Sequence, residues 1–395
     1  MRNVILANIL ITLVLVSAFD VAAFHFLPDA YIRNFPEYRH SIPDSVGGRV
    51  KYPHGYFTAH KTRGFDIGKN SKGSHWVEGM TYPIWSNSYG CFDVERAEVR
   101  EYVYFAGDSY TWGYAPFEQK FGTLVEQNSG TTVFKCGVTH TGQRHQVEKL
   151  RQIAAEIGHP PKAIFVFYSY NDIANDYAHP HSTVVDGWQL DRVMLDRDYQ
   201  PVLRTDEELQ RGVESRLAEQ RGWRSGAKRF LKRYSLTVNL LDYARDRGVR
   251  YVDRLRATST AADAAERAPK GLSHFYDLPH EKNGRYWYLD NPRAQANKSA
   301  LLDLRRFSAA NDAELIVVLI PPQEKATDTE WYQELRQFLA DNGIRYMDLA
   351  SEFRDLRVTQ DVLYWRRDGH LSTTGNRVVA EILVEKYPDV FPNSP

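Results

Sequence analysis

The sequence predicts an α/β fold built on a doubly wound, flavodoxin-like parallel sheet of five strands. From residue 101 onward, short apolar runs rich in β-branched and aromatic residues alternate with helical stretches, which is typical of βαβ units. The third run, 163–168 (AIFVFY), is apolar throughout, as expected of a strand buried on both faces. With 395 residues, of which 43% are hydrophobic, the chain is long enough for one large core.

The individual elements follow from the same pattern. Strands are expected at 102–106, 131–135, 163–168, 315–320 and 344–349. Helices are expected at 143–157, 297–310 and 330–341, and a last helix begins after Ser372, a residue type that favours N-caps. Because ligands of such sheets bind beyond the carboxyl ends of the strands, a site is expected in the loops that follow them.

The N-terminal 28 residues form an apolar segment. Residues 4–19 are almost uncharged, and Asp20 precedes a further apolar stretch. This run is longer than a signal-peptide core of about 7 to 15 residues and shorter than a comfortable span of about 20. Residues 1–28 are therefore interpreted as an uncleaved membrane anchor, which we favour, or as a signal peptide cleaved after Val21-x-Ala23, with a buried helix as the third interpretation. Both favoured interpretations predict export to the periplasmic or extracellular side.

The rest of the chain divides into three parts. Residues 29–100, rich in Gly, Pro, Tyr and His, predict an irregular extension packed on the domain formed by 101–390. Residues 176–296 interrupt the alternation with a charged, largely helical insertion, amphipathic around 231–255, which we interpret as a cap or lid. A basic cluster at 221–233 is interpreted as a solvated helix face, with lipid headgroups or an anionic polysaccharide as alternative partners.

Composition excludes several classes of function. Fifty basic residues balance fifty acidic ones, which argues against a nucleic-acid binder that works through bulk positive charge. Metal-ligand spacing, a phosphate-binding loop and a dinucleotide fingerprint are all missing, so neither a metal nor a cofactor is expected. The two cysteines, Cys91 and Cys136, are either a disulfide formed in an oxidising compartment or two buried thiols.

A serine directly follows the first predicted strand, in the segment 107–113 (GDSYTWG). Gly107 permits a tight turn there, so the hydroxyl of Ser109 is expected at the carboxyl edge of the sheet. A serine hydroxyl is a weak nucleophile by itself, and it needs a base within hydrogen-bond reach and donors for the developing oxyanion. An N-cap serine in an ordinary strand-to-helix turn is the alternative.

Three further blocks lie where a doubly wound sheet places loops around one crevice. They are Cys136-Gly137 after the second strand, Ser169-Tyr170-Asn171-Asp172 after the third, and Asp368-Gly369-His370 near the end of the chain. In chain order, Gly-Asp-Ser-x-Thr-x-Gly, a strand-end Gly, Asn-Asp and Asp-x-His resemble the blocks of the SGNH hydrolases, the GDSL esterase/lipase superfamily. The resemblance covers about residues 100–390 without the insertion.

The resemblance implies a role for each matching residue. Ser109 would attack an ester carbonyl, His370 would act as its general base, and Asp368 would orient the imidazole. The backbone N–H groups of Ser109 and Gly137 and the side-chain amide of Asn171 would hold the oxyanion.

This sequence departs from the family pattern in two places. The family usually has its acid three residues before the histidine, whereas Asp368 lies two before it, so Asp348 and Asp361 are alternative acids. The third block has Ser169-Tyr170 where the family prefers Gly-x, from which we expect a narrower pocket.

The function that follows is an exported serine ester hydrolase of SGNH type. Its expected substrate is a small-molecule or glycan ester, since 13% of the residues are aromatic. Trp112, Tyr114 and Tyr170 are candidates for stacking on a sugar ring. Two alternatives stay open: an O-acyltransferase that passes the acyl group to a polysaccharide through the same triad, and a non-catalytic glycan-binding or assembly protein that kept the fold.

Overall fold

The computed structural model describes most of the chain. The described residues are 2–28, 31, 35, 38–39, 53–78, 80–196, 200–221, 223–245, 281–282, 285–286, 292–329, 332–366 and 368–392. The predicted helical stretch at 231–255 and the predicted insertion at 176–296 fall partly outside these residues.

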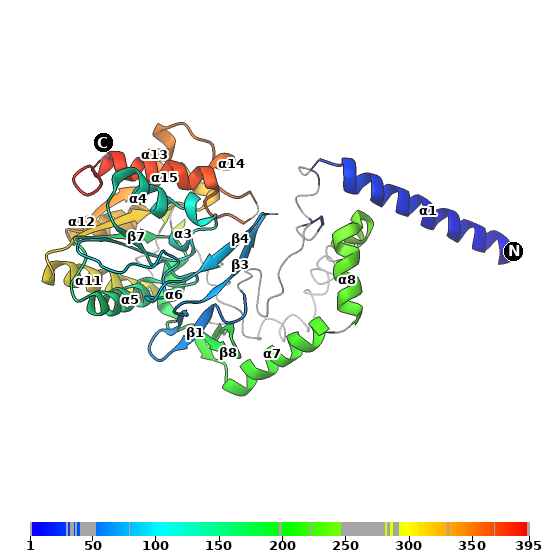
Figure 1. The fold of residues 1–395 in the computed structure, drawn as a ribbon, viewed down its shortest axis with the longest axis horizontal. Helices are drawn as coiled ribbons and strands as arrows, with labels where there is room; N and C mark the ends of the chain where they lie inside the picture. The colour runs from blue at the N-terminus through cyan, green and yellow to red at the C-terminus, as the bar shows by residue number, and fades with distance from the viewer. Residues whose placement is uncertain are drawn as a thin grey trace.

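A five-stranded parallel sheet forms the centre of the molecule (Figure 1). Its strands are β5 (Val103–Gly107), β6 (Val133–Lys135), β7 (Ala163–Tyr168), β14 (Glu314–Leu319) and β15 (Arg345–Asp348). They are arranged in the order β15-β14-β7-β5-β6, and every neighbouring pair is parallel. Numbered along the chain from β5, this order is 2-1-3-4-5, which confirms the predicted flavodoxin-like sheet.

Helices cover both faces of this sheet, as a doubly wound fold requires. One face packs against α5 (Gln143–Ile157), α11 (Gln295–Ala310) and α12 (Gln333–Asp341). The other face packs against α4 (Phe121–Ser129), α13 (Leu349–Asp355) and α15 (Thr373–Lys386). Figure 1 shows α4 and α15 on the side of the sheet opposite α5 and α11. Shorter helices connect these layers: α3 (Ser109–Trp112), η1 (Phe117–Gln119), α6 (Asp172–Tyr177), η4 (Pro292–Ala294), η5 (Gln323–Lys325) and α14 (Gln360–Leu363).

The predicted elements differ from the observed ones by at most three residues at either end. The strand at 163–168 and the helix at 143–157 have their predicted bounds. The last helix begins after Ser372, whose side chain accepts a hydrogen bond from the N–H of Gly375, as expected of an N-cap. These elements are well predicted because each buries one continuous apolar face against the sheet or within it.

The extension is more regular than its sequence suggests. We expected an irregular segment, but the structure has two antiparallel hairpins: β1 (Phe57–His60) with β2 (Gly64–Ile67), and β3 (Lys72–Val77) with β4 (Met80–Trp85). Their inward-facing rings form a separate apolar cluster with residues that follow β5, among them Trp112. The strands were missed because they have four to six residues each, too few for a clear alternating pattern.

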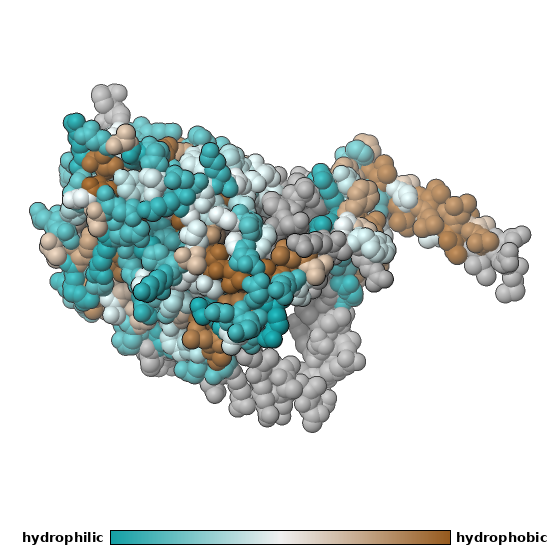
Figure 2. Space-filling view, turned by 60° about the horizontal axis from the view of Figure 1, so that its bottom comes forward, coloured by the Kyte–Doolittle hydropathy of each residue, from teal (hydrophilic) through white to brown (hydrophobic). Residues whose placement is uncertain are grey.

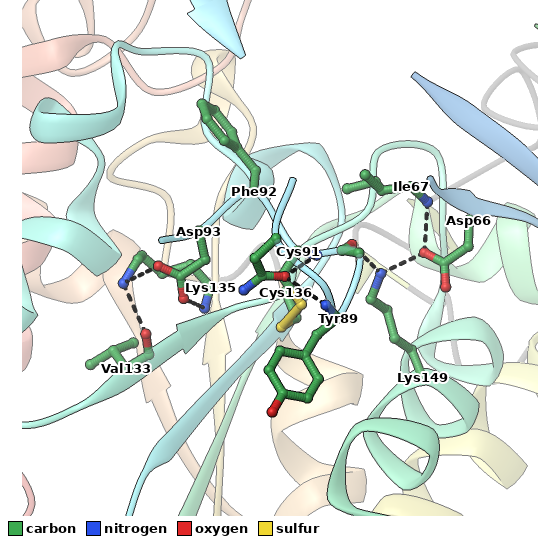
Figure 3. Close-up of a disulfide and its surroundings, with 12 residues drawn as sticks. Asp66, Ile67, Tyr89, Cys91, Phe92, Asp93, Val133, Lys135, Cys136 and Lys149 are labelled. Atoms are coloured by element: carbon green, nitrogen blue, oxygen red, sulfur yellow. Dashed lines mark hydrogen bonds and ion pairs between the residues drawn. A yellow bond between two sulfur atoms is a disulfide. The ribbon is translucent and has the colours of Figure 1, made fainter. Parts of the chain in front are cut away.

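A disulfide and a buried ion pair attach the extension to the edge of the sheet (Figure 3). Cys91 of the extension is bonded to Cys136, directly after β6. Two residues further along, Asp93 accepts hydrogen bonds from the N–H and the ammonium group of Lys135 on β6. The Asp93 and Lys135 side chains are both buried, and Lys135 also pairs with Glu126 of α4.

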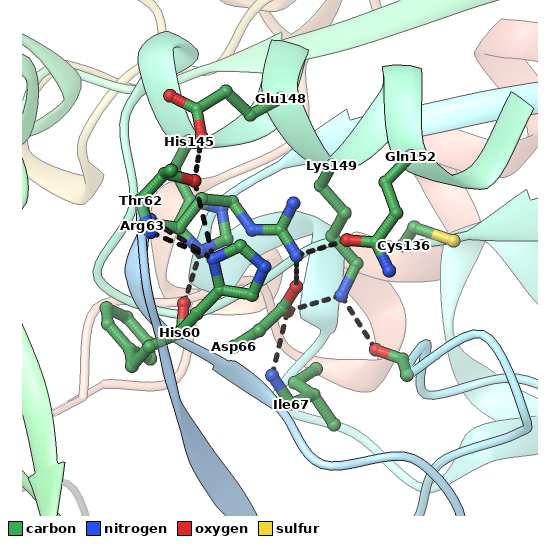
Figure 4. Close-up of polar contacts among 12 residues, drawn as sticks. His60, Thr62, Arg63, Asp66, Ile67, Cys136, His145, Glu148, Lys149 and Gln152 are labelled. Atoms are coloured by element: carbon green, nitrogen blue, oxygen red, sulfur yellow. Dashed lines mark hydrogen bonds and ion pairs between the residues drawn. The ribbon is translucent and has the colours of Figure 1, made fainter. Parts of the chain in front are cut away.

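A second group of buried charges attaches β2 to α5 (Figure 4). The carboxylate of Asp66 pairs with Lys149 of α5 and with Arg63 of its own hairpin. Burial works to raise the pKa of Asp66, but the nearby positive charges, that of Lys149 foremost, outweigh it and lower the pKa to about 2. Removing one partner of such a group leaves an uncompensated buried charge, so the extension is fixed in place by these contacts.

Most described residues of the insertion are helical, as predicted. It begins, however, with two antiparallel hairpins that the sequence did not indicate: β8 (Ser182–Val185) with β9 (Trp188–Asp191), and β10 (Val193–Leu195) with β11 (Pro201–Leu203). The helices α7 (Asp206–Arg221) and α8 (Trp223–Tyr234) follow, and a break at Ser235 separates α8 from a helical stretch at 236–245. A further hairpin joins β12 (Glu281–Lys282) to β13 (Arg285–Tyr286).

The apolar N-terminal segment is one helix, α1 (Arg2–Phe26), which projects from the body in Figure 1. Residues 6–26 are long and apolar enough to cross a membrane, with a mean hydropathy of 2.1, and only 6% of them are buried. Figure 2 shows this helix as an almost continuous apolar surface. The helix runs without interruption through 21–23, where the sequence has the pattern of a cleavage site.

Replacing both Cys91 and Cys136 by alanine is expected to lower the free energy of unfolding by about 2 to 4 kcal/mol, because the open chain gains conformational entropy when it unfolds. Urea titration of the detergent-solubilised protein, followed by tryptophan fluorescence, measures the change. Wild-type protein with reductant should behave like the double variant. An unchanged unfolding midpoint in both samples would show that the ion pairs hold the extension without the disulfide.

Candidate active site

The turn after β5 places Ser109 at the carboxyl edge of the sheet. Gly107 has φ +155°, and a Cβ there would lie 2.0 Å from Oγ1 of Thr111, so only glycine fits. Asp108 then caps α3, since its side chain accepts a hydrogen bond from the N–H of Tyr110 at 2.9 Å. Ser109 is the first residue of α3 and is 8% exposed, at the wall of a pocket.

The loop before α15 brings His370 to this serine. Nε2 of His370 lies 2.7 Å from Oγ of Ser109, and Nδ1 lies 2.6 Å from Oδ1 of Asp368. When Nδ1–H donates a hydrogen bond to the carboxylate, the lone pair of Nε2 faces the serine hydroxyl and can accept a hydrogen bond from it. Three residues from the first and last predicted blocks thus form one chain of hydrogen bonds.

Asp368 is held in its charged form. Burial works to raise the pKa of this carboxyl, but the charge and hydrogen bond of His370 outweigh it, so the pKa lies below its usual value. The two alternative acids lie elsewhere. Asp348 pairs with Arg336 and caps α13, and Asp361 is exposed in the first turn of α14. Of the three acids, the structure brings only Asp368 to His370.

Asp108 connects the turn that carries Ser109 to the loop after β7. Its Oδ2 accepts hydrogen bonds from Oγ of Ser169 and from Nδ2 of Asn171, both at 2.8 Å. The side chain is fully buried, so these charge-assisted bonds are not weakened by water. Asp108 was part of the quoted motif, but nothing in the sequence indicated this contact with a segment more than 60 residues away.

The carboxyl group of Asp172 lies close to that of Asp108. Asp172 is buried and accepts hydrogen bonds from the N–H of Ser169 and from Nε2 of Gln143. Burial and the nearby charge of Asp108 raise its pKa well above the usual value, which favours the protonated form. Asn171 is oriented by its hydrogen bond to Asp108.

Asn171 and Gly137 were predicted to bind an oxyanion. Asn171 lines the pocket, and since an amide nitrogen carries two protons, its bond to Asp108 leaves one N–H for another acceptor. Gly137 packs against the turn that carries Ser109. A Cβ at Gly137 would come within 2.3 Å of the backbone nitrogen of Trp112. Gly137 is therefore needed for close packing, and its oxyanion role stays a prediction.

Residues directly after the serine fix the histidine loop. The rings of Tyr114 and His370 are stacked with centroids 3.8 Å apart. The hydroxyl of Tyr110 donates to the carbonyl of Gly369 at 3.1 Å, and the indole N–H of Trp365 donates to the carbonyl of Tyr114 at 2.7 Å. Tyr110 and Tyr114 line the pocket, so one segment carries the serine and also positions the imidazole.

The prediction that Trp112 stacks on a substrate is wrong. Its side chain is fully buried in the cluster formed with the extension, and its indole N–H donates to the hydroxyl of Tyr56 at 3.0 Å. Tyr114 and Tyr170 do line the pocket.

The β3–β4 hairpin also reaches the triad, a contribution that the sequence did not predict. Glu78, at the turn of the hairpin, accepts a hydrogen bond from the N–H of Asp368 at 3.0 Å. His75 on β3 is buried, and its ring contacts those of Trp112 and Tyr114 edge to face. Burial lowers the pKa of His75 to about 3, so this ring is neutral and adds no positive charge beside His370.

The pocket around Ser109 has a volume of about 280 Å³. Its lining residues are Ser109, Tyr110, Tyr114, His140, Tyr170, Asn171, Pro322, Gln323, Glu324, Asp368, Gly369 and His370. Glu324, after β14, is an exposed carboxylate on this wall, and no lysine or arginine is among the described residues that line it. Residues 176–245 of the insertion do not line the pocket either, so this part of the insertion does not form the predicted lid.

Within the described part of the chain, no cluster of His, Cys, Asp and Glu could hold a metal ion.

His75 is expected to stay neutral from pH 8 to about pH 4, because its pKa is lowered to about 3. Acidification below about pH 6.5 should also destabilise the fold, since the unfolded chain then binds a proton at this histidine that the folded chain does not. NMR titration of protein with ¹³C-labelled histidine measures the pKa, and His75→Gln identifies the resonance. A midpoint near pH 6.5 would contradict the burial argument.

Comparison with known proteins gives distant likenesses only. No family model matches the sequence, and no curated protein matches it. One similar solved structure is that of a protein assigned to the lipolytic G-D-S-L family, from Desulfitobacterium hafniense DCB-2, with a TM-score of 0.37 and 11% sequence identity. That match covers 72% of this chain and 99% of that one.

A second similar structure is that of a catalytic mutant of an acetylxylan esterase from Geobacillus stearothermophilus. Its TM-score is 0.33 and its sequence identity 12%, over 73% of this chain and 94% of that one. Likenesses of this size carry no weight for the reaction of this chain. The fold class rests on the strand order and directions of the central sheet.

Proposed function

We propose that this protein is a membrane-tethered serine esterase of the SGNH type. The observation that carries the proposal is the chain of hydrogen bonds from Asp368 through His370 to Ser109, at 2.6 and 2.7 Å. A serine, an imidazole and a carboxylate in this order have the geometry of a nucleophile, its general base and the group that orients the base. That the three lie at the wall of a pocket supports a reaction with a bound small molecule.

The reaction proceeds in two halves. Oγ of Ser109 attacks the ester carbonyl while Nε2 of His370 takes the hydroxyl proton, and Asp368 stabilises the resulting imidazolium. The tetrahedral intermediate collapses to an acyl-serine, and the imidazolium gives its proton to the departing alkoxide, which leaves as the alcohol. Water then repeats the sequence and releases the carboxylic acid.

The oxyanion of the intermediate needs donors on the side of the serine away from the imidazole. The N–H groups of Ser109 and Gly137 and the second N–H of Asn171 are the proposed donors. The contact of Asn171 with Asp108 supports this role, because it fixes the direction of the amide before substrate binds.

The size of the pocket favours a short acyl group. A volume of about 280 Å³ is at the lower end of the usual range for small-molecule sites, about 300 to 1,000 Å³. The partly exposed ring of Tyr170 offers a surface for a sugar, which supports an O-acylated glycan as substrate. The alcohol part of such an ester would extend into solvent.

Two further observations support the finer parts of the proposal. Hydrolysis is favoured over acyl transfer because residues 176–245, the main described part of the insertion, do not line the pocket and so do not exclude water from an acyl-serine. Anchoring is favoured over a cleaved leader because the carbonyls of Ala23 and Leu27 accept hydrogen bonds from Arg39, so the C-terminal end of α1 packs against the rest of the chain.

Ser109→Ala and His370→Ala are each expected to lower kcat/KM for p-nitrophenyl acetate at least about 1,000-fold, because each removes a group that bonds to the transition state. Spectrophotometric release of p-nitrophenol measures the loss. A fluorophosphonate probe should label the wild type and leave Ser109→Ala unlabelled. Full activity in both variants would refute the triad, and a wild type without activity or labelling would favour the non-catalytic alternative.

The charge of the pocket is expected to disfavour anionic esters. Glu324→Gln should raise kcat/KM for p-nitrophenyl hemisuccinate about 3- to 10-fold and change that for p-nitrophenyl acetate less than about 2-fold, because it removes repulsion of the free carboxylate. The control is Glu214→Gln, an exposed glutamate on α7. Equal changes for both substrates would show that Glu324 acts on the shape of the pocket and not through its charge.

A further inference from the structure

The helix α8 has an apolar face that is largely exposed to solvent. Trp223, Ala227, Phe230 and Tyr234 recur at intervals of three and four residues, which places them on one side of the helix. Trp223 is 78% exposed and Phe230 is 63% exposed, values far above those of core residues. Large aromatic rings are costly to expose to water, so this face is expected to lie in an apolar environment.

The other side of α8 is basic. Residues 223–245 contain six lysines and arginines but a single acidic residue, Asp242. Lys228 and Lys232 both pair with Asp242, at 3.7 and 3.2 Å, so one carboxylate serves two ammonium groups. The segment therefore keeps a clear excess of positive charge. An apolar face flanked by lysines and arginines is typical of helices that lie in the surface of an anionic membrane.

α8 is also attached to the end of the apolar helix α1. Asp20 of α1 accepts hydrogen bonds from the side chain of Ser235 and from the N–H and hydroxyl of Thr237, both at 2.9 Å. The ring of Phe24 lies 5.5 Å from that of Tyr234. Asp20 lies near the C-terminal end of the 21-residue span, so these contacts hold α8 where α1 would leave the bilayer.

We propose that α8 is an interfacial helix that lies in the surface of the bilayer crossed by α1. Its apolar face would enter the boundary between headgroups and acyl chains, and its basic side would contact anionic headgroups. Aromatic residues are enriched at this depth, which fits Trp223, Phe230 and Tyr234. The inference rests on the anchoring part of the proposed function and is independent of the esterase reaction.

The test uses the full-length chain in nanodiscs and a polarity-sensitive fluorophore. Both native cysteines are in the disulfide, so a maleimide dye attaches only to an introduced cysteine. Ala227→Cys places the dye on the apolar face of α8, and the matched control Glu214→Cys places it on the exposed side of α7. In nanodiscs with 30% phosphatidylglycerol, lipids with a shallow doxyl group should quench the dye at 227 at least 3-fold more than the dye at 214.

Further arms of the experiment separate the contributions. In pure phosphatidylcholine, quenching at 227 should fall at least 2-fold, because the anionic headgroups are missing. In the background of Trp223→Ser and Phe230→Ser, it should fall to the level of the dye at 214 while the chain still elutes with the nanodisc.

Three outcomes would overturn the inference. Equal quenching at 227 and 214 in a chain that elutes with the nanodisc would make α8 a solvated helix and leave the anchor intact. Shielding of the dye by a soluble anionic polysaccharide alone would assign the surface to that partner. A chain that fails to enter nanodiscs would refute the anchor and α8 together, while hydrolysis of p-nitrophenyl acetate by the same sample would show that the proposed reaction is unaffected.

Discussion

The buried carboxylate of Asp108 is the contact on which the geometry of the site depends. One of its oxygens caps the helix that begins with Ser109, and the other accepts hydrogen bonds from Ser169 and Asn171. The register of the sheet makes this possible, because Gly107 at the end of β5 pairs with Phe167, one residue before the end of β7. A buried acceptor thus joins the turn that carries Ser109 to Asn171, the proposed oxyanion donor, before any substrate is present.

The N-terminal extension completes the site from the other side. It is fixed to the domain by the Cys91–Cys136 disulfide and by the buried ion pairs of Asp66 and Asp93. This attachment lets the β3–β4 hairpin present Glu78 to the backbone of Asp368 and place the neutral ring of His75 beside that of Tyr114. The segment that connects the apolar helix to the catalytic domain is therefore part of the support of the triad.

Sequence reasoning succeeded where a residue's neighbours are local or where the fold type fixes its place. The strand 163–168 and the helix 143–157 were predicted with their bounds because each has a continuous apolar pattern. Ser109, Asp368 and His370 were predicted because the order of their sequence blocks resembles that of the SGNH hydrolases, and the structure brings the three together. The hairpins of the extension were missed because their strands are short. The burial of Trp112 and the absence of residues 176–245 from the pocket lining were not predicted, because they depend on contacts between segments far apart in the chain.

The sequence by itself determined that an α/β sheet carries a serine, an asparagine and an Asp-x-His block at its carboxyl edge, since hydrophobic period and motif order are local properties. Only the tertiary structure decided which acid serves His370, what orients Asn171, and that α8 lies against the end of α1. The physical reason is that hydrogen bonds and burial depend on distance in space, and these partners are separated by 2, 63 and 217 positions in the chain. Even the first pair needed the structure, because Asp348 and Asp361 were alternative acids in the sequence.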